Sequence, residues 1–178
     1  MRFNTGVLIA CLAGVPLVAG GSLAGVGSQP SSDYIEIDGS KNPEQVPAWV
    51  AWETSFRVLA LARRKGSMAV PESLEMSEAE RQLVFHAAEG QAGRDAMCEE
   101  RVMRLKPLLG REKVEVLNEK TRAIQLDCRQ AVLDARDQLL RSLSPEAQAA
   151  LIIWVETRKA GIRSWVPRAE LDHYRRPD

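Results

Sequence analysis

One periodic stretch, residues 111–143, constrains the fold more than any other part of the chain. Apolar and small side chains recur there every three or four residues over about nine helical turns, and acids and bases alternate between them. A strand does not fit this period, because its side chains alternate at every second residue. The stretch predicts a long amphipathic helix whose buried face carries Val114, Leu117, Thr121, Ile124, Cys128, Ala131, Ala135 and Leu139.

The segment "LSPEAQ" ends this helix and begins another. Ser144 suits an N-cap, Pro145 suits the first helical position, and a helix is predicted to continue over residues 147–159. Because the connection is so short, the two helices are predicted to form a hairpin or a sharp elbow. Before the long helix, another helix is predicted over residues 94–106, ended by residues 107–110.

Two turns and two prolines, in "DGSKNPEQVP", precede a further amphipathic helix. Asn42 and Pro43 suit an N-cap and a first helical position, with Gln45 placed to close a capping box around one tight turn. The main helix is predicted to start at Pro47 and to run to about Lys65. Its aromatic and aliphatic stripe favours core packing, with a ligand platform as the alternative, and consists of Trp49, Trp52, Phe56 and Leu59.

Ser77 and Glu80 form the pattern of a second capping box, after a loop predicted over residues 66–76. In the helix that follows, Gly90 and Gly93 indicate either a break or a bend in one longer helix. The segment "YIEI" alternates like a strand but has no evident partner, so we expect it to lie extended over helices. The fold class predicted is all-α, with four or five helices, a long helical hairpin and an extended N-terminal segment.

The first residues follow the plan of a signal peptide. Arg2 is followed by an apolar run over residues 6–19, and small residues at Ser22 and Ala24 suit cleavage before Gly25. The chain is thus divided into a signal peptide (1–24), a flexible leader (25–33), a helical domain (34–167) and a polar tail (168–178). Trp165, which lies just before this tail, is predicted to dock on the core. An exported chain of this kind is periplasmic or extracellular. The alternatives are an uncleaved membrane anchor and lipidation at Cys11.

Two cysteines remain after removal of the signal peptide, and both fall on apolar helix faces. In an exported chain, Cys98 and Cys128 are predicted to form a disulfide, the alternative being two buried thiols. A simple hairpin centred near Leu108 would place Cys98 opposite Glu119, about 13 Å along the axis from Cys128. The bridge therefore requires a broader connection and a later start of the long helix.

Charge and motifs exclude several classes of function. Lys plus Arg and Asp plus Glu both number 24, so the whole chain has no field that favours nucleic acid or, after cleavage, a membrane. No motif predicts a catalytic, cofactor or metal site. His86 and Glu89 have the spacing of a helical metal motif, but the chain lacks the second copy that such bundles need. The acids Asp95, Glu99 and Glu100 are interpreted as an ordinary solvated helix face.

The helix starts "MSEAER" and "LSPEAQ", in an exported, helical chain with few cysteines, resemble the Spy and CpxP group of periplasmic proteins. That resemblance implies an ATP-independent chaperone or a stress-sensing role on a concave helical surface. The hallmark of the group is Leu-Thr-x-x-Gln, whereas here Gln148 follows Ser144 by four residues. The start "DGSKNPEQVP", followed by "AW", also resembles small uncharacterised exported bacterial proteins and implies no function.

The function predicted is an exported, non-enzymatic helical interaction protein, a scaffold, adaptor or chaperone-like binder with a protein partner or client. This hypothesis predicts an exposed apolar groove. The alternatives are an envelope structural protein held by its uncleaved N-terminus and a metal-dependent protein that uses His86 and Glu89. The aromatic residues proposed for interaction or for the core are Trp49, Trp52, Phe56, Trp154 and Trp165.

Overall fold

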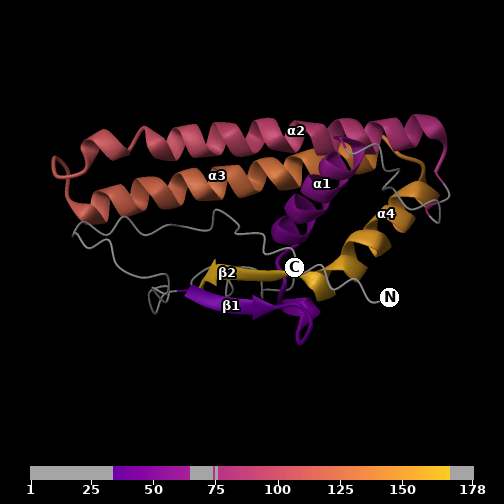
Figure 1. Cartoon of the computed structure of the whole chain (residues 1–178), viewed down its shortest axis with the longest axis horizontal. Coiled ribbons are helices and arrows are strands. Elements are labelled where there is room, and N and C mark those ends of the chain that lie inside the picture. Colours follow the sequence, from indigo (N-terminus) through magenta and orange to yellow (C-terminus); the bar gives the residue numbers. More distant parts are fainter. Residues whose placement is uncertain (1–33, 65–73, 75, 169–178) are drawn as a thin grey trace. The chain divides into compact units, whose positions relative to one another are not determined.

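The computed structural model describes residues 34–64, 74 and 76–168, and Figure 1 shows its elements. The predicted signal peptide, the predicted leader, most of the loop predicted over residues 66–76 and most of the predicted polar tail lie outside the described residues. Four α-helices dominate what is described, so the all-α prediction with four or five helices is confirmed. In chain order the elements are β1 (Tyr34–Asp38), η1 (Pro43–Gln45), α1 (Ala48–Arg64), α2 (Glu78–Met103), η2 (Lys106–Leu108), α3 (Val114–Arg141), α4 (Pro145–Arg158), η3 (Lys159–Gly161) and β2 (Arg163–Pro167).

The elements fall into two compact units, of which the smaller joins the segment before α1 to the segment after α4. In this unit β1 pairs antiparallel with β2, from Tyr34 opposite Pro167 to Asp38 opposite Arg163. The expectation that "YIEI" lies extended over helices is therefore wrong. Its partner strand is "RSWVP", and pairing of segments so distant in the chain leaves no local pattern to detect.

The period of two in β2 places neighbouring side chains on opposite faces of this small sheet. Ser164 and Val166 are buried, whereas Trp165 between them is 41% exposed. The prediction that Trp165 docks on the core is wrong for this reason. Strand geometry gives the buried face to its two smaller neighbours.

The turn after β1 needs a glycine. The Gly39 amide donates to the Ile162 carbonyl over 2.9 Å, and a Cβ at Gly39 would lie only 1.8 Å from the Lys159 carbonyl oxygen. The tight turn predicted over residues 43–46 is present as η1, with Pro43 at its start. Asn42 makes no side-chain capping hydrogen bond there, so the predicted capping box with Gln45 is wrong.

The larger unit, residues 48–158, contains the four α-helices and the main core. Helix α1 packs against α2, α3 and α4. Its predicted stripe is buried, and the rings of Trp52 and Phe56 meet in a tilted pair with centroids 5.7 Å apart. The helix begins at Ala48, one residue after Pro47, as expected for a proline that precedes a helix.

Helix α2 is continuous through Gly90 and Gly93. The predicted break and the separate helix over residues 94–106 are therefore wrong. A glycine costs roughly 1 kcal/mol in a helix relative to alanine, and packing against α1 and α3 outweighs that cost. At the other end the capping box is confirmed, because Ser77 and Glu80 make both reciprocal hydrogen bonds.

Helices α2 and α3 form the long helical hairpin and run side by side in Figure 1. Of the hairpin and the sharp elbow predicted for the short connection between α3 and α4, the elbow is the one present. Helix α4 packs against α1. Val114, predicted on the buried stripe of α3, is 51% exposed, whereas Leu117 and Leu139 are buried as predicted. Within the described residues, no helix has both the length and the apolar character that a membrane span requires.

Candidate functional site

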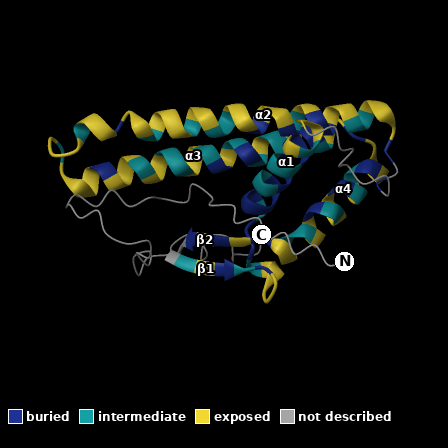
Figure 2. Ribbon diagram, in the orientation of Figure 1, coloured by how far each residue is buried: buried dark blue, intermediate teal, exposed yellow. Residues whose placement is uncertain are grey.

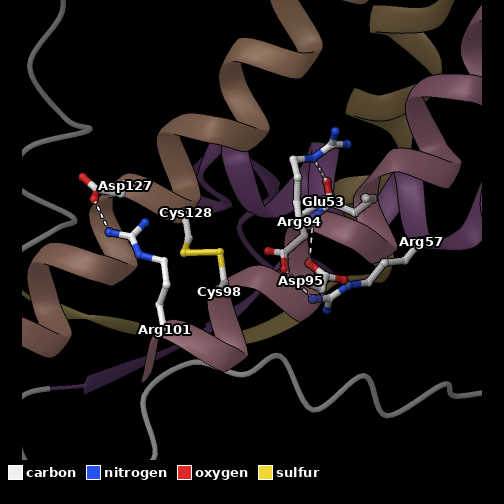
Figure 3. Close-up of a disulfide and its surroundings, with 9 residues drawn as sticks. Glu53, Arg57, Arg94, Asp95, Cys98, Arg101, Asp127 and Cys128 are labelled. Atoms are coloured by element: carbon white, nitrogen blue, oxygen red, sulfur yellow. Dashed lines mark hydrogen bonds and ion pairs between the residues drawn. A yellow bond between two sulfur atoms is a disulfide. The ribbon is translucent and has the colours of Figure 1, made fainter. Parts of the chain in front are cut away.

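The α2–α3 hairpin is clamped by its two cysteines. The Sγ atoms of Cys98 and Cys128 lie 2.12 Å apart, at disulfide distance, with Cα atoms 6.1 Å apart (Figure 3). Five residues of α2 follow Cys98, whereas fourteen residues of α3 precede Cys128. The difference of about nine residues amounts to roughly 13 Å of helix axis, and the connection over residues 104–113 accommodates it. The broader connection and the later helix start that a bridge requires are both present.

A network of ion pairs joins α1 to α2 beside the disulfide (Figure 3). Arg57 donates to Glu53 Oε1 over 2.6 Å and to Asp95 Oδ2 over 2.8 Å, and Gln91 donates to Asp95 Oδ1 over 2.8 Å. Burial raises the pKa of Glu53, while the nearby Arg57 opposes that rise. The interpretation of Asp95 as part of a solvated face is wrong, because its carboxylate pairs in the interface with α1.

Arg94 of α2 and Arg129 of α3 both lie over aromatic rings of α1. Arg94 donates to the Gln91 side chain and to the Ala87 carbonyl, both over 3.0 Å, and its guanidinium lies 5.7 Å from the centre of the Phe56 ring. Burial lowers the pKa of Arg94. Arg129, only 6% exposed, lies 4.6 Å from the centre of the Trp49 ring. The guanidinium groups of Arg57, Arg94 and Arg129 therefore all contact other groups of the protein. Their contacts join α1, α2 and α3 to one another.

Glu80 joins the starts of two helices. One carboxylate oxygen accepts from the amide and hydroxyl of Ser77, over 2.9 and 2.7 Å. The other accepts from the amide and hydroxyl of Ser144, over 3.1 and 2.6 Å. These hydrogen bonds, that of the Ser144 hydroxyl first, lower the pKa of Glu80 to about 2. The sequence predicted both caps separately and missed that one carboxylate serves both, which brings "MSEAER" and "LSPEAQ" together.

The predicted aromatic residues have different surroundings. Trp49, Trp52 and Phe56 are buried in the core, which excludes the ligand platform. Trp154 is half-buried, with the Arg158 guanidinium 4.8 Å from the centre of its ring. Trp165 lies on the exposed face of β2. The three rings of α1 therefore serve the core, and Trp154 and Trp165 are the two of the five that reach the surface.

The histidine and carboxylate of the metal alternative are not brought together with further ligands. His86 is exposed, and Glu89 Oε1 accepts from Arg63 Nε over 3.2 Å. Over residues 34–64, 74 and 76–168, no group of three or more His, Cys, Asp or Glu side chains is placed to hold a metal ion. Glu89 therefore serves an ion pair between α1 and α2.

Large apolar side chains remain exposed along the helices of the larger unit. Four of them gather where α2 and α3 are connected, at residues 103–116, a segment here named the hairpin tip. Figure 2 shows that most of this end of the hairpin is exposed. Sequence periodicity missed the tip because it assigned Val114 to the buried stripe. The exposed set consists of Leu61, Leu83, Met97, Met103, Leu109, Val114, Val116, Leu126, Ile152 and Ile153.

The disulfide divides the hairpin into two parts. Helix α1 meets α2 at Glu89 and Asp95, and meets α3 at Arg129, all on the side away from the tip. The tip lies on the other side of the disulfide. Comparisons with known protein families, with curated proteins and with solved structures found no match. The resemblance to the Spy and CpxP group therefore stays a prediction.

Proposed function

We propose that the chain is an exported, non-enzymatic interaction protein, a scaffold, adaptor or chaperone-like binder that holds a protein partner or client through exposed apolar side chains. The observation that carries this proposal is the set of ten large apolar side chains exposed on the helical unit. Apolar side chains in contact with water cost free energy that binding recovers, so exposed apolar side chains that lie together suit a partner. Helices commonly present anchors of this kind to a partner.

The cysteine pair supports export. Disulfides persist in oxidising compartments and are rare in the cytosol. Cys98 and Cys128 lie at disulfide distance, and the sequence before residue 25 has the plan of a signal peptide. Cleavage near Gly25 and a periplasmic or extracellular location are parts of the same proposal.

The helical unit suits binding without a large rearrangement. The disulfide, the ion pairs of Arg57 and the hydrogen bonds of Glu80 each join two helices. A surface held in advance loses less conformational entropy when a partner binds. The exposed apolar side chains are thus presented on a pre-organised frame.

Site-specific photo-cross-linking in cells tests the proposal. A cross-linker is placed in turn at Met97 and Ile153, which are 58% and 63% exposed, and at the exposed Glu119 as a polar control. We expect reproducible protein adducts from the two apolar positions and few from Glu119. Intact-mass analysis of the recovered chain is expected to show a start near Gly25. Equal labelling at all three positions, or a mass that retains Met1, would contradict the proposal.

A further inference from the structure

The hairpin tip differs from the other exposed apolar positions in its charge. Its exposed apolar side chains are Met103, Leu109, Val114 and Val116. The same segment carries four bases, Arg104, Lys106, Arg111 and Lys113, against two acids, Glu112 and Glu115. The whole chain, by contrast, has equal numbers of bases and acids. The tip is therefore a local concentration of positive charge around apolar side chains.

Three of the four bases keep their charge available. Arg104 pairs with Glu100 over 2.6 Å, and Glu112 is taken up by Lys120, also over 2.6 Å. The structure records no ion pair for Lys106, Arg111 or Lys113 within its described residues. These three cations flank the exposed Leu109 and Val114 in the sequence. An anion that approaches the tip therefore meets three cations that are not already paired with an acid of the described residues.

The start of α3 adds to this positive end. Lys113 is the N-cap residue of this 28-residue helix, and its side chain makes no capping hydrogen bond. The first amides of a helix lack partners inside the helix and carry the positive end of its dipole. A helix start of this kind favours phosphate and other anions. Gly110, with φ of +78°, turns the chain just before it.

From these features we infer that the hairpin tip docks on the surface of an anionic lipid bilayer. The exposed apolar side chains enter the boundary between headgroups and acyl chains, and the cations and the start of α3 face the lipid phosphates. The end of a two-helix hairpin projects, and a projecting end suits a lipid surface, whereas an acidic peptide is held better by a groove. This contact does not span the membrane. It also departs from the expectation of no membrane partner, which rested on the charge of the whole chain.

Sedimentation with lipid vesicles tests this inference on the full-length chain. The vesicles contain phosphatidylglycerol mixed with phosphatidylcholine, or phosphatidylcholine alone. The tip variant combines Arg111→Gln with Lys113→Gln. The matched control combines Arg122→Gln with Arg141→Gln, which removes two exposed bases from α3, outside the tip. We expect preferential binding to the anionic vesicles, reduced about ten-fold or more in the tip variant and weakened by salt.

A second pair of variants tests the apolar contribution. Val114→Gln in the tip is expected to lower binding to anionic vesicles several-fold, whereas Ile153→Gln on α4 leaves it unchanged. Equal losses in the tip and control variants would overturn the inference, because the charge of the whole chain would then explain binding. Equal binding by all variants would do so too, because the apolar run over residues 6–19 would then explain it. Absence of binding to anionic vesicles would overturn it too, as would capture by a polyglutamate peptide without vesicle binding. The proposed protein client is judged separately, by cross-linking at Met97 and Ile153.

Discussion

The two ends of the α2–α3 hairpin have opposite surroundings, with the disulfide between them. The base, meaning the part of the hairpin on the α1 side of the disulfide, meets α1 through ion pairs at Glu89 and Asp95 and through the ring contact of Arg129. At the tip, Val114 and Met103 are 51% and 45% exposed. One pair of helices thus supplies a stabilising interface at one end and an exposed surface at the other.

This contrast separates stability from binding. Burial of apolar side chains stabilises the base, and removal of one partner of its half-buried ion pairs costs stability because the other charge is left unpaired. Exposed side chains at the tip contribute little to the free energy of unfolding, since their surroundings change little when the chain unfolds. Substitutions at the base should therefore change stability, and substitutions at the tip should change binding.

The largest expected effect is at Phe56, which is 1% exposed and contacts Trp52 in the core. Phe56→Ala removes a buried ring and leaves a cavity, so we expect a loss of about 3 to 5 kcal/mol in the free energy of unfolding. The measurement is urea unfolding followed by circular dichroism. Ile153→Ala, at an exposed position, is the control and should cost below about 0.5 kcal/mol. Similar costs for both variants would remove the distinction between core and surface.

The next effect is that of the disulfide. Replacing Cys98 and Cys128 together by serine opens a loop with a sequence separation of 30 residues, worth about 3.6 kcal/mol in the chain-entropy model. Urea unfolding of the oxidised chain and of the double variant measures this difference. Adding a reductant should bring the unmodified chain close to the variant. If peptide mapping without reductant recovers both thiols free, the clamp is absent.

A smaller loss is expected when the ion pairs of the base are broken. Arg57→Met leaves the half-buried carboxylates of Glu53 and Asp95 without this partner, at a cost of about 2 kcal/mol at neutral pH. Because the folded pKa of Glu53 is already raised and rises further without Arg57, protonation relieves the cost. The loss should therefore shrink as pH falls through that folded pKa. If the loss of stability in Arg57→Met does not change with pH, then Arg57 does not affect the pKa of Glu53.

The smallest effect on stability is expected at Glu80, whose carboxylate lies at the surface. Hydrogen bonds lower its pKa from 4.5 to about 2, so the stabilisation is present above pH 4.5 and is lost as pH falls towards 2. Glu80→Gln should be less stable than the unmodified chain at neutral pH and should match it near pH 2. Thermal unfolding across this range, with Glu119→Gln as a control, measures the difference. A gap that persists at pH 2 would point to lost packing instead.

Much of the helical fold was predictable, because helix boundaries and buried faces leave local patterns. The capping residues Ser77 and Ser144, and the stripe of α1, are visible in the sequence because they depend on neighbours three or four residues away. Gly90 and Gly93 misled the prediction, since their local cost is outweighed by packing that comes from other helices.

The features that concern interaction were harder to predict, because they depend on distant partners. The strand over residues 163–167 pairs with a segment more than 100 residues earlier. Asp95 meets Arg57 of another helix, and Glu80 meets Ser144. The tip was not predicted, because the apolar stripe of α3 continues as far as Val114. The sequence does not show that this end of the stripe remains exposed. Only the disulfide gave a usable long-range constraint, through the offset between its cysteines.

Hydrogen exchange of the oxidised full-length chain, alone and with anionic vesicles, tests the division of the hairpin most directly. Amides of the base should exchange slowly, because their release requires opening of the core, and those of the tip should exchange faster. Vesicles that contain phosphatidylglycerol should then slow exchange at residues 103–116 and leave the base unchanged. Equal exchange at both ends without vesicles, or protection by vesicles confined to the base, would contradict this division.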